Sequence, residues 1–399
     1  MKLTLKNTPE QIELIKAMGS KNPSTAKEAQ EAFAAFLGPV ISQVLMTAGT
    51  ASQIYTDSEF NEDDNPSYPL DLYYNENEGY ITVWSQHLAG GLPTSQVEGV
   101  SEMKIATYRL DTAVSWLKRY ARRSRLDVIS KALERMANEM LIKQERNAWA
   151  VILRALAEAN STTRHGNTSN ANSNANYGKS LVREHIVKGA SAGKLKLDDL
   201  NDLMTILKRV NESYSGHTPS SVYSQGLTDL YLSPELKGWI RSFAWNPLNT
   251  TGAASSEGYD NLPDSVREET FRAGGMQSIF GVNINEMIEF GKAQKYNTLF
   301  NSFADANTPG TGDGSGSAGS QFDHLMDDEI VVGLDNSRGA FLRPVAREAE
   351  SGGTFTALPD EQFNAYGSRV EKVGFYGYLE EGRVCLDARA IAGLVIPGV

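Results

Sequence analysis

The hydrophobic pattern changes its period within residues 103–159. Up to Trp116, apolar and polar residues alternate, which is the repeat of a half-buried strand. From Leu126 onward, apolar residues recur at alternating steps of three and four, which is the repeat of an amphipathic helix. The segment 124–159 contains neither Pro nor Gly, so we expect one helix roughly 50 Å long, with its apolar end at 148–157 buried. Such a strand and helix form a spine to which other elements should attach.

Short helices are predicted ahead of this spine. Thr8-Pro9-Glu10-Gln11 is a capping box with Pro at the first helical position, and it predicts a helix that ends at Gly19. Thr25 caps a second helix that should end at Gly38-Pro39, and a third follows over 40–48. None of these helices is long enough to form a hydrophobic core by itself. We therefore expect an N-terminal arm whose helices pack on the surfaces of other elements.

An aromatic hairpin is predicted between the arm and the spine. Residues 57–64 are expected to form an acidic loop, and 70–74 and 80–84 to form the two strands. A two-stranded ribbon is marginal alone in water, so it needs a surface to lie on, and a neighbouring subunit is one candidate. The aromatic residues of this region are Tyr68, Tyr73, Tyr74, Tyr80 and Trp84.

The remainder of the chain mixes helices and strands. Segments 160–179 and 309–320 have the low-complexity composition of loops. Together the elements predict an α+β fold in which segments from both ends of the chain share layers. The predicted elements are a helix over 197–214, a strand over 221–232 followed by a helix from Pro234, a turn and strand over 278–284, and strands within 330–332, 341–345, 374–379 and 384–396.

Composition narrows the possible functions. The chain has 399 residues, enough for two or three compact units. Its net charge of −11 argues against wholesale binding of nucleic acid. The single cysteine, Cys385, excludes an internal disulfide framework and a cysteine-rich metal site. Residues 32–56 carry no charge, but Gly38-Pro39 and several polar residues interrupt them, so buried helices are favoured over a membrane span.

No motif in the chain predicts catalysis or a cofactor. Residues 314–319 match the glycine spacing of a dinucleotide-binding turn, but they follow no predicted strand. Residues 189–194 are one residue short of a P-loop, and Leu195 stands where Ser or Thr is needed. The histidines share no ligand-like spacing. We therefore predict no catalytic, cofactor-binding or metal-binding residues, and an enzyme would need a polar pocket that the sequence does not reveal.

A basic cluster follows the long strand and contains no acid. It could be a solvated face, it could pair with the acidic loop of the same or another subunit, or it could contact nucleic-acid phosphates. The aromatic hairpin could be a ligand site, although Tyr and Trp favour a subunit interface. The candidate interface comprises the hairpin aromatics together with Glu59, Glu62, Asp63, Asp64, Lys118, Arg119, Arg122, Arg123 and Arg125.

The order of these elements resembles a tailed-bacteriophage major capsid protein of the Hong Kong 97 type. Its most specific part is the strand, basic turn and long helix, from Met103 through Arg123 into 147–154. Shorter stretches add to the resemblance, and their order supplies the specificity. These stretches are 230–235, 278–282, 330–333 and 386–395.

The resemblance implies a Hong Kong 97-like fold and a non-enzymatic structural subunit. Its expected parts are an N-terminal arm (1–56), an extended loop (57–117), a peripheral domain with the spine helix (118–220), an axial domain (221–370) and a strand that returns to the peripheral domain (371–399). Such subunits self-assemble into hexamers and pentamers of an icosahedral virion shell.

The implied partners are other copies of the chain, a separate scaffold, a portal, decoration proteins and non-specifically packaged double-stranded DNA. Neither a cofactor nor a membrane is implied, and assembly would occur in the host cytoplasm. A bacterial encapsulin-type compartment shares the fold and is the alternative function.

Overall fold

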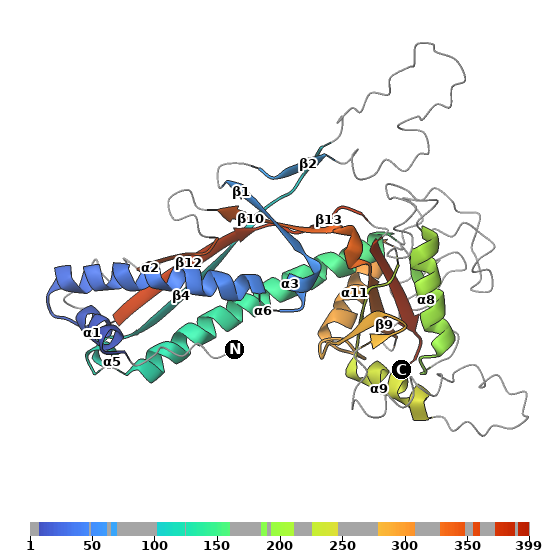
Figure 1. Ribbon diagram of the computed structural model, residues 1–399, viewed down its shortest axis with the longest axis horizontal. Coiled ribbons are helices and arrows are strands. Elements are labelled where there is room, and N and C mark those ends of the chain that lie inside the picture. The colour runs from blue at the N-terminus through green and yellow to red at the C-terminus, as the bar shows by residue number, and fades with distance from the viewer. Residues whose placement is uncertain are drawn as a thin grey trace, which may run out of the picture. The chain divides into compact units, whose positions relative to one another are not determined.

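The computed structural model shows two compact units, each assembled from separate segments of the chain (Figure 1). Unit 1 comprises Met1–Tyr68, Glu102–Ala148 and Phe341–Val384, and unit 2 comprises Pro69–Ser101, Trp149–Ala340 and Cys385–Val399. The structure describes residues 8–47, 49–61, 65–69, 102–123, 125–159, 185–189, 193–210, 226–245, 278–307, 328–347, 354–359, 372–387 and 390–398.

Unit 1 combines helices from the start of the chain with strands from its beginning, middle and end. The described elements in or entering it are α1 (Pro9–Met18), α2 (Pro23–Thr47), α3 (Ala51–Ile54), β1 (Thr56–Asn61), β2 (Ser67–Pro69), β3 (Glu102–Lys104), β4 (Tyr108–Leu117), α5 (Lys118–Arg122), α6 (Leu126–Ala159), β10 (Phe341–Arg347), β11 (Thr356–Pro359), β12 (Lys372–Glu381) and β13 (Val384–Cys385).

Strand β12 is the centre of the sheet in unit 1. It pairs antiparallel with β4 over its whole length, from Lys372↔Leu117 to Glu381↔Tyr108. On its other side it pairs with β11 and, at Val345↔Glu381, with β10. Strand β1 then runs parallel to β10. The beginning and end of the chain therefore share one sheet, as the sequence predicts.

The prediction of an acidic loop over 57–64 is wrong for residues 57–61, because these residues belong to strand β1. Parallel pairing with β10 gives this backbone its hydrogen-bond partners. Its acidic residues alternate with Ser58 and the half-buried Phe60, so one face of the strand stays polar. The local excess of acids concealed this alternation. Glu62, Asp63 and Asp64 lie outside the described residues.

The predicted helix break at Gly38-Pro39 is also wrong, because α2 continues through it to Thr47. A proline inside a helix costs about 3 kcal/mol through its missing N–H and its steric clash. On either side of the break, Leu37 is 2% exposed and Ile41 is fully buried. Burying one such side chain contributes about 1.5–3 kcal/mol, so packing on both sides offsets the proline.

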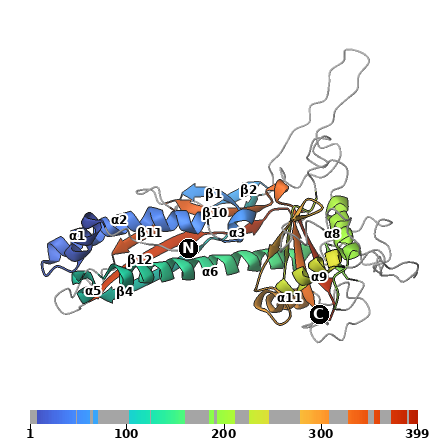
Figure 2. The same ribbon diagram turned by 60° about the horizontal axis from the view of Figure 1, so that its bottom comes forward.

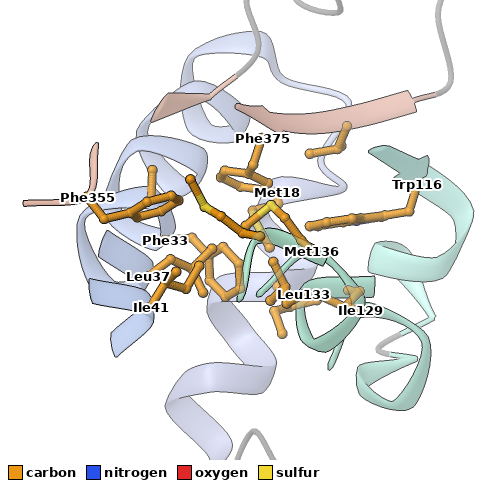
Figure 3. Packing of buried hydrophobic residues seen from close by; sticks show 14 of the residues in the cluster. Met18, Phe33, Leu37, Ile41, Trp116, Ile129, Leu133, Met136, Phe355 and Phe375 are labelled. Atoms are coloured by element: carbon orange, nitrogen blue, oxygen red, sulfur yellow. The ribbon is translucent and has the colours of Figure 1, made fainter. Parts of the chain in front are cut away.

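The core of unit 1 joins the arm helices to the sheet and to the first part of α6 (Figure 2). The Phe375 ring lies 5.4 Å from Phe33 of the arm and 5.4 Å from Trp116 of β4, centroid to centroid. Leu133 of α6 contributes to the same cluster (Figure 3). This packing confirms that the arm helices bury their apolar faces on other elements.

The long helix is confirmed as α6, with the predicted bounds of its pattern. Its residues up to Ala148 belong to unit 1 and the rest to unit 2. Trp149 is fully buried and packs against Tyr231, Phe290 and Tyr296 in unit 2, at centroid distances of 4.9, 5.3 and 5.9 Å. The predicted burial of the apolar end of the helix is therefore also confirmed.

Unit 2 is built around a sheet in the order β5-β14-β9-β6-β8-β7. Its central strands β9 and β14 are buried at every position, as expected of strands covered on both faces. Besides the end of α6, its described elements are β5 (Ile186–Lys188), α8 (Leu197–Val210), β6 (Asp229–Leu232), α9 (Pro234–Trp245), β7 (Ser278–Ile279), β8 (Val282–Glu286), α11 (Lys295–Asn307), β9 (Glu329–Leu334), η3 (Asn336–Arg338) and β14 (Ile391–Ile396).

The mixture of helices with mostly antiparallel sheets confirms the α+β class. The division into units differs from the expected domain boundaries at several places, one of them after Ala340, inside the expected axial domain. It falls inside α6, after Ala148. It also divides 371–399, because β12 belongs to unit 1 whereas β14 closes the sheet of unit 2. The single strand region predicted over 384–396 is in fact β13 and β14, separated by residues outside either strand.

We predict that Gly377 is required by the ring of Phe355. A Cβ on Gly377 would lie 2.3 Å from Cζ of that ring. Gly377→Ala should therefore lower the unfolding free energy of unit 1 by about 1–3 kcal/mol, as overpacking does. Adding Phe355→Leu should recover part of this loss, as measured by chemical denaturation. As a control, Gly238→Ala in α9 places its methyl group in open space and should stabilise by up to about 1 kcal/mol. Unchanged stability of Gly377→Ala would contradict this contact.

Candidate functional site

A buried ionic cluster lies where β12 ends in unit 1, centred on Glu381. The Glu381 side chain is fully buried. Arg343 Nε donates to its Oε2 at 2.8 Å, and Gln144 Nε2 donates to the same oxygen at 3.1 Å. Tyr108 donates its hydroxyl to Oε1 at 2.7 Å, and Arg383 Nη2 donates to that oxygen at 3.3 Å. Both carboxylate oxygens are therefore occupied by partners from four segments of the chain.

The cluster extends from Glu381 to two neighbouring groups. Arg343 Nη1 also lies 3.5 Å from Asp57 Oδ1 of β1. The guanidinium of Arg383 lies over the Tyr55 ring, with Cζ 4.9 Å from the centroid. Tyr55 in turn donates its hydroxyl to the carbonyl of Ala148 at 3.0 Å. Ion pairs link strands β1, β10 and β12, and hydrogen bonds from Tyr108 and Gln144 join strand β4 and helix α6 to them.

The electrostatics of the cluster favour the neutral form of its phenol. Burial raises the pKa of Tyr108 to about 12, and the negative charge of Glu381 adds to this rise. Burial also raises the pKa of Asp57, against the opposing charge of Arg343. The hydroxyl of Tyr108 therefore remains a hydrogen-bond donor throughout the neutral pH range. We interpret the cluster as a structural node, since its carboxylate is fully engaged.

Sequence reasoning missed this node because its members are far apart in the chain. One signal in the sequence could have found it. Val373, Phe375 and Leu379 are buried at alternate positions of β12, and Glu381 continues that series. A carboxylate at an inward position of a strand requires a buried cation, and this points to nearby arginines.

The predicted basic cluster is divided by the structure into buried and exposed members. Lys118 is buried. Arg122 donates from Nε to the carbonyl of Gly19 at 2.7 Å, which fastens the end of α1 to α5. Arg119, whose guanidinium lies over the Tyr120 ring with Cζ 5.2 Å from the centroid, is exposed. Arg123 and Arg125 are exposed as well. Arg122 is exposed too, but its Nε is engaged by Gly19, and the other three arginines remain at the surface for a partner.

Of the acids of the candidate interface, Glu59 falls within the described residues, and it pairs with β10. Arg347 Nη1 lies 2.8 Å from Glu59 Oε2, and both side chains are about half exposed, at 52% and 50%. Asp57 pairs with Arg343 of the same strand. Figures 1 and 2 show α5 at one end of unit 1 and β1 toward the other. Pairing of this acidic region with the basic cluster stays a prediction, and it would require two copies of the chain.

Only one of the hairpin aromatics falls within the described residues. Tyr68 is half-buried in β2, which pairs with β3. The predicted hairpin strands and their aromatic residues lie outside the described part of the chain. The residues concerned are Tyr73, Tyr74, Tyr80 and Trp84.

A second surface that sequence reasoning missed lies on the open face of the β4–β12 pair. The guanidinium of Arg109 stacks on the Tyr378 ring, with Cζ 3.8 Å from the centroid. Tyr376 donates its hydroxyl to Asp111 Oδ1 at 2.6 Å, and Arg109 Nε donates to the same oxygen at 2.7 Å. The bond from Tyr376 lowers the pKa of Asp111, and the same bond raises the pKa of Tyr376. This face presents aromatic and charged groups already joined to one another.

Among the described residues, no group of three His, Cys, Asp or Glu side chains is arranged to hold a metal ion. No helix in that part of the chain combines the length and apolar character that a membrane crossing needs. The glycine-spaced motif at 314–319 lies outside the described residues, as do 190–192 of the P-loop-like stretch.

We predict that Glu381→Gln destabilises unit 1 strongly. The amide would remove the carboxylate that Arg343 and Arg383 share, leaving Arg343 only its longer contact with Asp57, and breaking a buried pair costs about 3–5 kcal/mol. Glu380→Gln is a matched control, because Glu380 is only partly buried and accepts a hydrogen bond from Thr107. It should cost less than about 1.5 kcal/mol. Denaturant unfolding of both variants checks this, and equal losses would contradict the central role of Glu381.

We predict that Tyr108 makes stability depend on pH in alkaline solution. Its pKa rises from 10.0 to about 12 on folding, so its contribution is complete below pH 10 and is lost as pH rises toward 12. Over this window wild type should lose about 2–3 kcal/mol more than Tyr108→Phe. Denaturant unfolding at a series of pH values measures the difference, and parallel curves would mean that the phenol is not held protonated.

The chain was also compared with known proteins. No family model matches it, and no curated protein does. The capsid of the native GTA particle is 13% identical, with 88% of this chain and 91% of that chain covered and a TM-score of 0.43. The capsid of cyanophage P-SCSP1u is 12% identical, with coverages of 87% and 88% and a TM-score of 0.42. The SrpI encapsulin complex of Synechococcus elongatus is 11% identical, with coverages of 75% and 77% and a TM-score of 0.34. Phage capsids are thus among the solved structures to which this chain is similar.

Proposed function

We propose that this chain is a structural, non-enzymatic subunit that assembles with copies of itself into an icosahedral phage shell around double-stranded DNA. The observation that carries this proposal is the succession of β4, α5 and α6 without interruption by another element. A strand, a basic turn and a long helix in this order are the most specific part of the resemblance to capsid proteins.

The construction of unit 1 supports this role. Strands from both ends of the chain meet at β12, and a buried ionic cluster fixes their junction. Such a unit can remain folded when neighbouring subunits bind to its surfaces. Three exposed arginines of its basic cluster then remain available for contacts between copies, rather than for the internal core. They are Arg119, Arg123 and Arg125.

Charge indicates how neighbours could meet in such a shell. The chain carries a net charge of −11, so a local group of exposed arginines is attracted to the net negative charge of another copy. The acidic β1 and basic α5 lie toward opposite ends of unit 1 (Figures 1 and 2). Contact between these two ends of different copies would join opposite charges. The aromatic hairpin is proposed to lie on a neighbouring subunit as well.

The remaining parts of the proposal follow from the shell role. Hexamers and pentamers would be the capsomers of a shell located in the virion and assembled in the host cytoplasm. A scaffold, a portal and decoration proteins would be its protein partners. The packaged DNA would be contacted without sequence specificity.

We predict that wild type forms capsomers or megadalton shells, with any scaffold it requires, and that Arg123→Glu/Arg125→Glu impairs this assembly. Both residues are exposed, so circular dichroism and melting should be unchanged. Assembly should need roughly tenfold more protein, which corresponds to about 1.4 kcal/mol per contact. Sedimentation and electron microscopy measure it. Lys131→Glu/Lys143→Glu, with the same charge change on exposed α6 positions, is the control and should assemble normally.

The outcomes separate the alternatives. A wild-type chain that stays monomeric under all assembly conditions would contradict the shell role. Shells that form in cells and enclose protein rather than DNA would indicate the encapsulin-type function instead. Normal shells from the Arg123→Glu/Arg125→Glu variant would leave the shell role intact and remove the basic cluster from its contacts.

A further inference from the structure

Two apolar side chains at the ends of one strand are the most exposed large hydrophobic residues in the described part of the chain. Ile288 is 81% exposed and Phe280 is 50% exposed. Phe280 lies in the turn before β8, and Ile288 lies in the turn after it. Both belong to unit 2. A single exposed aliphatic residue is ordinary, but the conformation of Phe280 is not.

Phe280 is held in a conformation that suits other residues better. Ile279 pairs with Val282, so Phe280 and Gly281 form a two-residue hairpin turn. Both have positive φ, at 51° and 82°, as such a turn requires. Asn and Gly favour the first of these positions, whereas a bulky ring there is strained. Ile279 and Val282 are 3% and 2% exposed, so the buried pair below keeps the ring at the tip.

The polar groups beside Phe280 are already bonded to one another. Asp229 accepts hydrogen bonds from Asn283 Nδ2 at 3.2 Å, from Thr228 Oγ1 at 2.8 Å and from Asn336 Nδ2 at 2.7 Å. Asn283 is paired in the ladder with Ser278, next to the turn. The tip therefore offers a neutral ring, and the polar groups of the adjoining ladder are engaged with one another. This chemistry fits an apolar protein surface and does not fit a phosphate.

The other end of β8 has the same character. Glu286, its last residue, pairs with Lys237 Nζ at 2.9 Å. Ile288 follows two residues later with most of its surface in water. The chain thus carries two different apolar points at opposite ends of a five-residue strand. When two different patches of one subunit meet, the contact is head-to-tail, and its repetition closes a ring or extends a filament.

We infer that the Phe280 turn of one copy packs against the Ile288 turn of the next copy. This inference rests on the proposed function, because it assigns a contact between the subunits of a shell. Each copy places its Phe280 ring on one neighbour and receives the Phe280 ring of another neighbour at its Ile288 turn. The contact therefore recurs at every subunit. The strained turn and the exposed ring are then explained together, because the ring becomes buried only on assembly.

The test combines single and double variants. Phe280→Asn puts the residue that suits this turn in place of the ring, so the melting temperature of the isolated subunit should rise or stay the same. The protein concentration needed for capsomers or shells should increase roughly tenfold, as for loss of an aromatic anchor. Ile288→Asn should have a similar effect on assembly without a change in melting. The double variant should assemble as well as the single variant that assembles less well, because both changes remove the same contact.

Leu358→Asn is the matched control, since Leu358 is 46% exposed and belongs to unit 1. It should assemble like wild type. Normal assembly of either single variant, or additive effects in the double variant, would overturn the contact while the shell role stands. Failure of wild type to assemble under all conditions would overturn the proposed function and, with it, this contact. A lower melting temperature for Phe280→Asn would show that the ring serves the subunit itself.

Discussion

The buried carboxylate of Glu381 is the constraint on which the arrangement of unit 1 depends. Apolar packing such as that of Phe375 requires elements to be close but tolerates small shifts, because hydrophobic attraction is non-directional. A buried ion pair is less tolerant, since a shift leaves a charge without its partner. Arg343 and Arg383 meet Glu381 at 2.8 and 3.3 Å, and Tyr108 and Gln144 occupy the remaining positions. Elements distant in sequence are thereby held in one register.

The parts of the fold that the sequence predicts are those that local periodicity determines. Helix α6 buries a continuous stripe and contains neither proline nor glycine, so its bounds follow from the pattern alone. The parts it could not predict depend on tertiary partners. Pro39 does not interrupt α2, because Leu37 and Ile41 are buried on either side of it. Strand β1 has an acidic sequence, and only its pairing with β10 makes it a strand.

The candidate site was predictable to a similar extent. Charge clustering drew attention to Arg123 and Arg125, which are exposed. It could not separate them from Arg122, whose role of holding Gly19 at 2.7 Å appears only when α1 and α5 are side by side. The alternation of β12 places Glu381 inward, but its cationic partners lie on other segments. Long-range pairing of this kind leaves no trace in the spacing of residues along the chain.

Glu381 and Phe280 illustrate two different requirements: stability of the isolated subunit, and contact between subunits. At Glu381 both carboxylate oxygens are matched inside the subunit, so the isolated subunit accounts for this arrangement. At Phe280 the backbone is strained and the ring is half exposed, and neither feature benefits the isolated subunit. Strain persists where the surrounding structure imposes it, and it often marks a functional position. A buried pair imposes the turn, but it does not require a ring at its tip. In the proposed shell the burial missing from one subunit is completed by the next, so the stability of the assembly exceeds what each chain secures alone.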